Sequence, residues 1–208
     1  MSGFKTPYPD YDVLEKRDSP SWNEQTREAV RQRLEDVPPR RFLSEEQWTL
    51  LEAIVARLVP QPDREEPVPI VPWIDEMLHK NETPGYRYAD MPPMREAWQR
   101  GLDAIAAEAR NRDGRSFEQL PPDEQDALLT DIQRNRVDKQ IWGDLPAGGF
   151  FLHHLLKQTV GIYYSHPDAW SEIGFGGPAS PRGYARLGFD ERDPWEAKEL
   201  HFEAADDA

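Results

Sequence analysis

The 208-residue chain contains no cysteine, no long apolar run and no strand-like alternation of apolar and polar residues. Without cysteine, this chain has no disulfide bond, thiolate metal site, iron–sulfur cluster or covalently attached c-type haem. No segment approaches the roughly 18 apolar residues of a membrane-spanning helix. The missing alternation argues against a substantial β-sheet.

Positive charge is also scarce. The sequence has 25 lysine and arginine residues against 39 aspartate and glutamate residues, which gives a net charge of −14. Nucleic acids and anionic membrane surfaces both require a basic contact face, so neither is an expected partner. The acidic balance is compatible with a basic protein partner, although it is also typical of a soluble surface.

The first 18 residues lack the apolar stretch of a signal peptide. Arg40 and Arg41, followed by Phe42 and Leu43, have the look of a twin-arginine export motif. We reject that interpretation because acidic residues follow Ser44, where an apolar run is needed. A cytoplasmic or periplasmic location is expected, with the cytoplasm favoured.

Apolar residues at helical spacing predict a mostly α fold with about six helices. The clearest helix begins at Ser44, whose capping box is closed by Gln47, and stops at Pro60. A second capping box, formed by Ser21 and Glu24, predicts that the first helix is capped by Ser21. The six expected helices cover residues 21–37, 44–59, 72–79, 93–112, 122–134 and 149–164.

The distribution of the 20 prolines and 13 glycines suggests three regions. Residues 1–20 are expected to form an extended N-terminal arm with a few apolar anchors, or else a disordered tail. Residues 21–164 are expected to form a helical body. Residues 165–208 are expected to form an irregular C-terminal arm, rich in aromatic residues, glycine and proline, that packs on the body and on a partner.

The start of the C-terminal arm holds bulky apolar side chains among helix-breaking residues. Such a segment must bury them, either against its own helical body or against another protein. Because tryptophan, tyrosine and arginine dominate interface hot spots, we expect a partner interface in this region. The residues assigned to it are Phe150, Phe151, Tyr163, Tyr164, Trp170, Phe175, Arg182 and Tyr184.

No motif in the sequence assigns a catalytic residue, a cofactor-binding residue or a metal ligand. There is no glycine-rich dinucleotide fingerprint after a strand, no nucleophile elbow and no zinc-protease motif. His153, His154 and His166 form the best alternative, a metal site in a free-standing α-helical enzyme. Adjacent helical residues point about 100° apart, so His153 and His154 do not readily share one ion.

Several motifs resemble those of a known family. They are Phe150-Phe151, then Thr159-Val160-Gly161 with Tyr163-Tyr164-Ser165 and Pro167, and finally Ile173-Gly174-Phe175-Gly176-Gly177-Pro178. Their order resembles the C-terminal signature of the gluconate 2-dehydrogenase subunit 3 family. A further stretch, residues 20–27, is similar to the N-terminal part of family members.

The resemblance implies a non-catalytic small subunit that binds and stabilises a larger flavoprotein. That partner is expected to be an FAD-bearing catalytic subunit of the glucose–methanol–choline (GMC) type, which oxidises a sugar, glycoside or polyol. It often passes electrons to a cytochrome c subunit. Family members often also carry a twin-arginine leader and help to export the complex, a role that the absence of a visible leader here leaves open. On this reading the chain binds no cofactor itself, and FAD resides on the partner.

Overall fold

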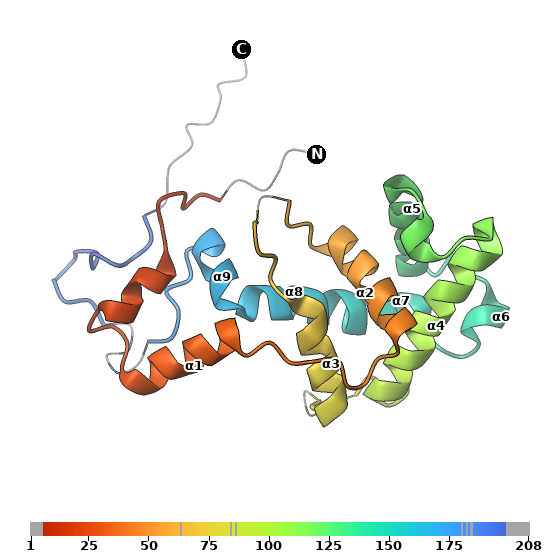
Figure 1. Cartoon of the computed structure of the whole chain (residues 1–208), viewed down its shortest axis with the longest axis horizontal. Coiled ribbons are helices and arrows are strands. Elements are labelled where there is room, and N and C mark those ends of the chain that lie inside the picture. The colour runs from red at the N-terminus through yellow and green to blue at the C-terminus, as the bar shows by residue number, and fades with distance from the viewer. Residues whose placement is uncertain are drawn as a thin grey trace, which may run out of the picture. The chain divides into compact units, whose positions relative to one another are not determined.

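The computed structural model describes residues 6–62, 64–83, 85, 87–179, 181, 183 and 185–198. Within these residues the fold is entirely helical and contains no strand, which confirms the expected mostly α class (Figure 1). None of the helices in these ranges is both long and apolar enough to cross a membrane. The α-helices are α1 (Glu24–Glu35), α2 (Glu45–Leu58), α3 (Ile70–Lys80), α4 (Met94–Asp113), α5 (Pro122–Gln133), α6 (Lys139–Trp142), α7 (Ala147–Phe150), α8 (Lys157–Ser165) and α9 (Pro167–Trp170).

Short helical segments of other types complete the described structure. Three are 3₁₀ helices, namely η1 (Val13–Asp18), η2 (Phe117–Gln119) and η4 (Ser171–Ile173). The fourth, η3 (Phe151–Leu156), is a π-helix that joins α7 to α8. The six longer α-helices match the six expected from sequence, whereas α6, α7 and α9 are single turns of four residues each.

The predicted N-cap of α2, Ser44, is confirmed, whereas the predicted N-cap of α1, Ser21, was wrong. Ser44 accepts a hydrogen bond from the backbone N–H of Gln47, and the reciprocal bond completes the capping box. In α1 the cap is Asn23, whose side chain accepts from the N–H of Thr26 at 2.9 Å. Ser21 instead belongs to the preceding turn, because its own N–H donates to the hydroxyl of Ser19.

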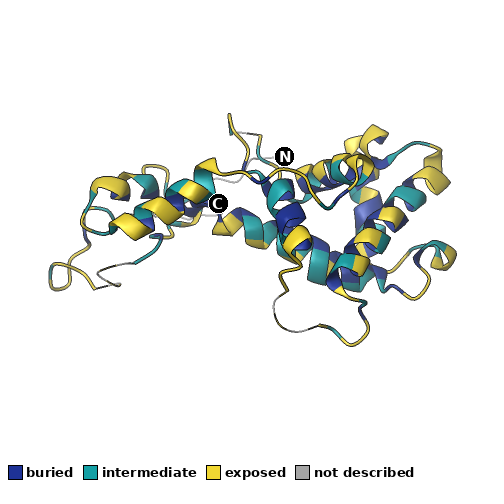
Figure 2. Cartoon of the chain, turned by 60° about the horizontal axis from the view of Figure 1, so that its bottom comes forward, coloured by how far each residue is buried: buried dark blue, intermediate teal, exposed yellow. Residues whose placement is uncertain are grey.

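Spatial contacts between backbone positions divide the chain into two compact units. The central unit covers residues 38–163, and the terminal unit combines residues 1–37 with residues 164–208. The sequence had placed α1 in the helical body, whereas the structure groups α1 with the C-terminal segment. Within each unit the buried residues lie on the inward faces of the helices (Figure 2).

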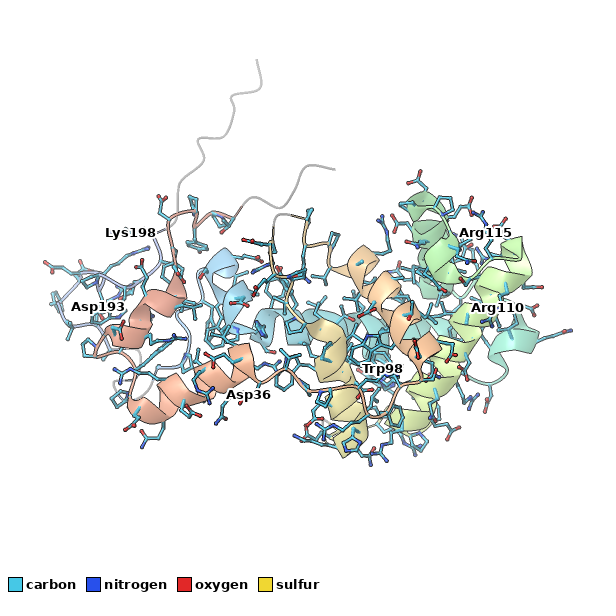
Figure 3. All side chains as sticks on the ribbon, in the orientation of Figure 1. Asp36, Trp98, Arg110, Arg115, Asp193 and Lys198 are labelled. Atoms are coloured by element: carbon cyan, nitrogen blue, oxygen red, sulfur yellow. The ribbon has the colours of Figure 1, made fainter. Side chains whose placement is uncertain are left out.

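The central unit is built around large buried side chains from α2, α3, α4 and α5. Trp98 of α4 is fully enclosed, and Figure 3 shows it inside the helices of this unit. A buried carboxylate supports the entry to α2: the two oxygens of Asp75 accept hydrogen bonds from the backbone N–H groups of Arg41, Phe42 and Leu43 at 2.6–3.2 Å. Arg41, in the stretch that looked like an export motif, pairs with Glu76 at 2.7 Å.

The terminal unit has its own small core, made by Val13, Trp22, Val30 and Trp170. The N-terminal arm is tied to the C-terminal segment by hydrogen bonds. The hydroxyl of Thr6 donates to the carbonyl of Glu172 at 2.7 Å, and the ammonium of Lys16 donates to the carbonyl of Gly176 at 2.7 Å. These two bonds join the described part of the N-terminal segment to the C-terminal segment.

Candidate functional site

The bulky residues predicted to face a partner divide into buried and exposed groups. In the terminal unit, Trp170 is only 8% exposed and belongs to the small core. Phe175 is 39% exposed and meets Trp170 edge-on, with ring centroids 5.4 Å apart. The backbone N–H of Phe175 donates to the carbonyl of Trp170, which holds the glycine-rich turn against the core. The ring of Phe175 is therefore partly exposed to solvent and packs edge-on against the buried ring of Trp170.

Glycine is needed where this turn crosses the core. Gly177 has a φ of +69°, and a Cβ at this position would lie 3.0 Å from the ring of Trp22 and 3.3 Å from that of Trp170. Any side chain would strain the backbone and push the turn away from both rings. The glycines that suggested irregular structure thus allow the turn to approach two tryptophans closely.

In the central unit, the predicted aromatic residues are largely internal. Phe150 is fully buried and packs edge-on against Trp98, with ring centroids 5.8 Å apart. Phe151 is also buried. Tyr163 is buried under the guanidinium of Arg64, whose central carbon lies 5.7 Å from the ring centroid. These side chains therefore belong to the interior of the central unit and offer little surface of their own.

Other predicted residues lie on the surface or outside the described structure. Tyr164, the first residue of the terminal unit's C-terminal segment, is 38% exposed. Arg182 and Tyr184 lie outside the described residues. The assignment of these positions to an interface stays a prediction.

The structure adds exposed apolar residues to this region. Leu187 is 68% exposed, Phe189 is completely exposed, and Ile173 is 43% exposed. Leu187 and Phe189 line a groove of about 840 Å³ in the terminal unit, together with Tyr8, Gly174 and Gly176. Sequence reasoning overlooked Phe189 and the place of Tyr8 in this groove. The sequence does contain a signal for Phe189: it follows Leu187 by two positions and is one more large apolar residue in the same glycine- and proline-rich segment.

The three histidines of the alternative metal site have different surroundings. His166 is buried in the terminal unit, with Nδ1 3.4 Å from a carboxylate oxygen of Asp168. His153 and His154 are in the central unit, where His153 stacks on Tyr88 with ring centroids 3.8 Å apart. Among the residues that the structure describes, no group of three or more metal-binding side chains is close enough to hold an ion. The described geometry therefore lends the metal-dependent enzyme no support.

The chain matches one family of known proteins. Residues 45–177, more than half of the chain, match the family model described as Gluconate 2-dehydrogenase subunit 3. No curated protein and no solved structure matched the chain. The matched residues run from the start of α2 to the glycine-rich turn over Trp170, so they include most of the predicted interface. The chain therefore belongs to the gluconate 2-dehydrogenase subunit 3 family, whose members are small subunits of dehydrogenase complexes.

Proposed function

We propose that this chain is a non-catalytic small subunit that binds and stabilises an FAD-bearing, GMC-type catalytic subunit. The catalytic partner oxidises a hydroxyl group of a sugar, glycoside or polyol, with a cytochrome c subunit as a further electron-carrying partner. Membership of a family of dehydrogenase small subunits supports this assignment. FAD is assigned to the partner because dinucleotide sites of the Rossmann type are built where a strand turns into a helix, and the described residues include no strand.

The observation that carries the proposal is the exposed apolar surface of the terminal unit. Ile173, Phe175, Leu187 and Phe189 come from one short stretch of chain and remain exposed at their side chains. Large apolar groups gathered in one region of a soluble protein mark interaction sites, because leaving them in water costs free energy that a partner can recover. The groove beside Leu187 and Phe189 offers the concave surface that an inserted partner side chain needs.

The buried members of the predicted interface contribute indirectly. Truncating Trp170 would leave a cavity in the small core and cost about 3–5 kcal/mol of folding free energy. Its substitution therefore reports on folding rather than on docking. Phe175 is the cleaner probe, because its ring is partly exposed and lies over Trp170 without completing the core.

Co-expression with a candidate GMC flavoprotein tests the proposal. We expect the two chains to co-purify with a visible flavin spectrum, and Phe175→Ala to weaken assembly by about 2 kcal/mol if the ring is a hot spot. Leu152→Ala is the matched control, because Leu152 is also a large exposed apolar residue but lies in the central unit.

Two results would contradict the proposal at different levels. A wild-type chain that never co-purifies with the flavoprotein would overturn the subunit assignment. Normal assembly of Phe175→Ala, or an equal loss in Leu152→Ala, would remove the interface from the C-terminal segment while leaving the subunit assignment intact.

A further inference from the structure

A separate cavity in the central unit has an unusual charge for this acidic protein. Its volume is about 310 Å³, and it lies between the loop preceding α4 and the helix that contains η3 and the start of α8. The basic groups Arg87, Lys157, His153 and His154 line it. No carboxylate belongs to the described lining, although acidic residues outnumber basic ones by 39 to 25 in the whole chain.

The π-helix explains how both histidines reach this cavity. In an α-helix, neighbouring side chains diverge by about 100°. A π-helix closes its hydrogen bonds over five residues instead of four, so each turn holds more residues and neighbours diverge less. His153 and His154 both lie within η3, and both line the cavity. Single π turns inside longer helices are frequent at functional sites.

Local electrostatics favour an anion in the cavity. Burial, followed by the nearby His153 and Lys157, lowers the pKa of His154. The Nε2 atom of His154 is buried and finds no hydrogen-bond partner among the described residues. A buried polar atom without a partner costs free energy, so a ligand that accepts a hydrogen bond from a protonated nitrogen would relieve that cost.

Aromatic and apolar groups also line the cavity, beside the uncharged polar residues Asn81, Thr83 and Gln158. Tyr88 stacks on His153 with an angle of 19° between the rings, and Met94 and two prolines complete this side. The loop that carries Tyr88 is held by Arg87, whose guanidinium donates to the carbonyl of Met91 at 3.3 Å. The cavity therefore combines the cationic side chains of Arg87 and Lys157 with an aromatic and apolar surface.

We propose that this cavity binds a small organic carboxylate with an apolar or aromatic body. The carboxylate lies against Lys157, Arg87 and the histidine pair, since charge-assisted hydrogen bonds to such groups are the strongest that a protein offers. The body packs on Tyr88 and Met94. The cavity volume is at the lower end of the roughly 300–1,000 Å³ typical of ligand sites, which restricts the ligand to a small molecule. The proposal does not depend on the identity of the flavoprotein partner.

Benzoate and benzamide form a matched pair of probes, because they share a shape and differ in charge. Calorimetric titration of the 208-residue chain, alone or in its flavoprotein complex, should show benzoate binding at least about tenfold more tightly than benzamide, the value of one charge-assisted contact. Lys157→Gln should weaken benzoate binding by a similar factor. Lys139→Gln, which removes an exposed lysine of α6 away from the cavity, should leave binding unchanged.

A spectroscopic measurement localises the ligand. In an NMR titration of the histidine ring protons, benzoate should raise the pKa of His154 and benzamide should not, because only benzoate adds a negative charge beside the ring. Three results would overturn the proposal: no benzoate binding up to about 10 mM, equal affinity for benzoate and benzamide, or equal binding by the Lys157→Gln and Lys139→Gln variants.

Discussion

The contact between Gly101 and Phe150 shows how closely single residues are fitted in the central unit. Gly101 lies within α4, where alanine would normally favour the helix by about 0.5–1 kcal/mol. A Cβ at this position would overlap three atoms of the Phe150 ring, which is fully buried and has no room to move aside. We expect Gly101→Ala to destabilise the protein by about 1–3 kcal/mol, as overpacked cores do. Denaturant unfolding measures the difference.

Gly161 provides the control for this substitution. It is also helical, in α8, but a Cβ added there would meet none of the described atoms within 4 Å. Gly161→Ala should therefore raise the free energy of unfolding by about 0.5–1 kcal/mol. If both variants change stability in the same direction, close packing between Gly101 and Phe150 does not govern the effect.

Other residue roles were beyond sequence reasoning for a clear physical reason. Asp75 looks like one more acidic residue on a helix, yet it is fully buried and receives backbone hydrogen bonds from residues more than 30 positions earlier. Glu108 is similar: it is buried and accepts from the N–H of Asp138 and the indole of Trp142. Such roles depend on which backbone groups the fold brings near, and local periodicity carries no information about that.

At the scale of elements, the sequence predicted the longer helices well because their signals are local. Capping residues, apolar spacing and prolines act within a few positions, and the six expected helices correspond to α1 to α5 and to the composite helix from α7 to α8. The π-helical segment inside that last helix was not predicted. A π turn is rare and has no capping or spacing signal of the kind that marks the longer helices, and its residues Phe151 and Leu155 are buried as an α-helical pattern would also predict.

The N-terminal arm depends on one glycine in the C-terminal segment. Gly174 has a φ of +64°, and a Cβ there would lie 2.6 Å from the ring of Tyr8. We expect Gly174→Ala to displace Tyr8 and loosen the arm, in addition to a cost of about 1–2 kcal/mol for the left-handed backbone. Limited trypsin digestion checks this result, since Lys16 and Arg17 of η1 should be cleaved faster once the arm is released.

The matched variant for this test is Gly183→Ala. Gly183 also has a positive φ, +71°, but its added Cβ would have no described atom within 4 Å. It should carry the backbone cost without loosening the arm. Equal trypsin sensitivity in both variants would show that the contact with Tyr8 does not hold the arm.

At the scale of the whole molecule, the grouping of elements was the least predictable feature. The sequence order suggests an arm, a body and a second arm, whereas the structure assembles residues from both ends of the chain into the terminal unit. The contacts responsible join positions about 160 residues apart, such as Lys16 with Gly176. The large ring side chains of the C-terminal segment divide between buried positions such as Trp170 and exposed positions such as Phe189, and composition does not distinguish the two.

The position of the terminal unit's apolar residues allows the docking surface to be mapped within an assembled complex. A photo-crosslinking amino acid placed at Phe189, which is fully exposed, or at Phe175 should attach the chain to the flavoprotein on irradiation. The same group placed at Arg134, an exposed residue at the end of α5, should give background levels of product. Mass spectrometry of the crosslinked peptides identifies the partner segment. Because large apolar side chains concentrate the free energy of association, efficient crosslinking at Arg134 with none at the two phenylalanines would move the docking surface to the central unit.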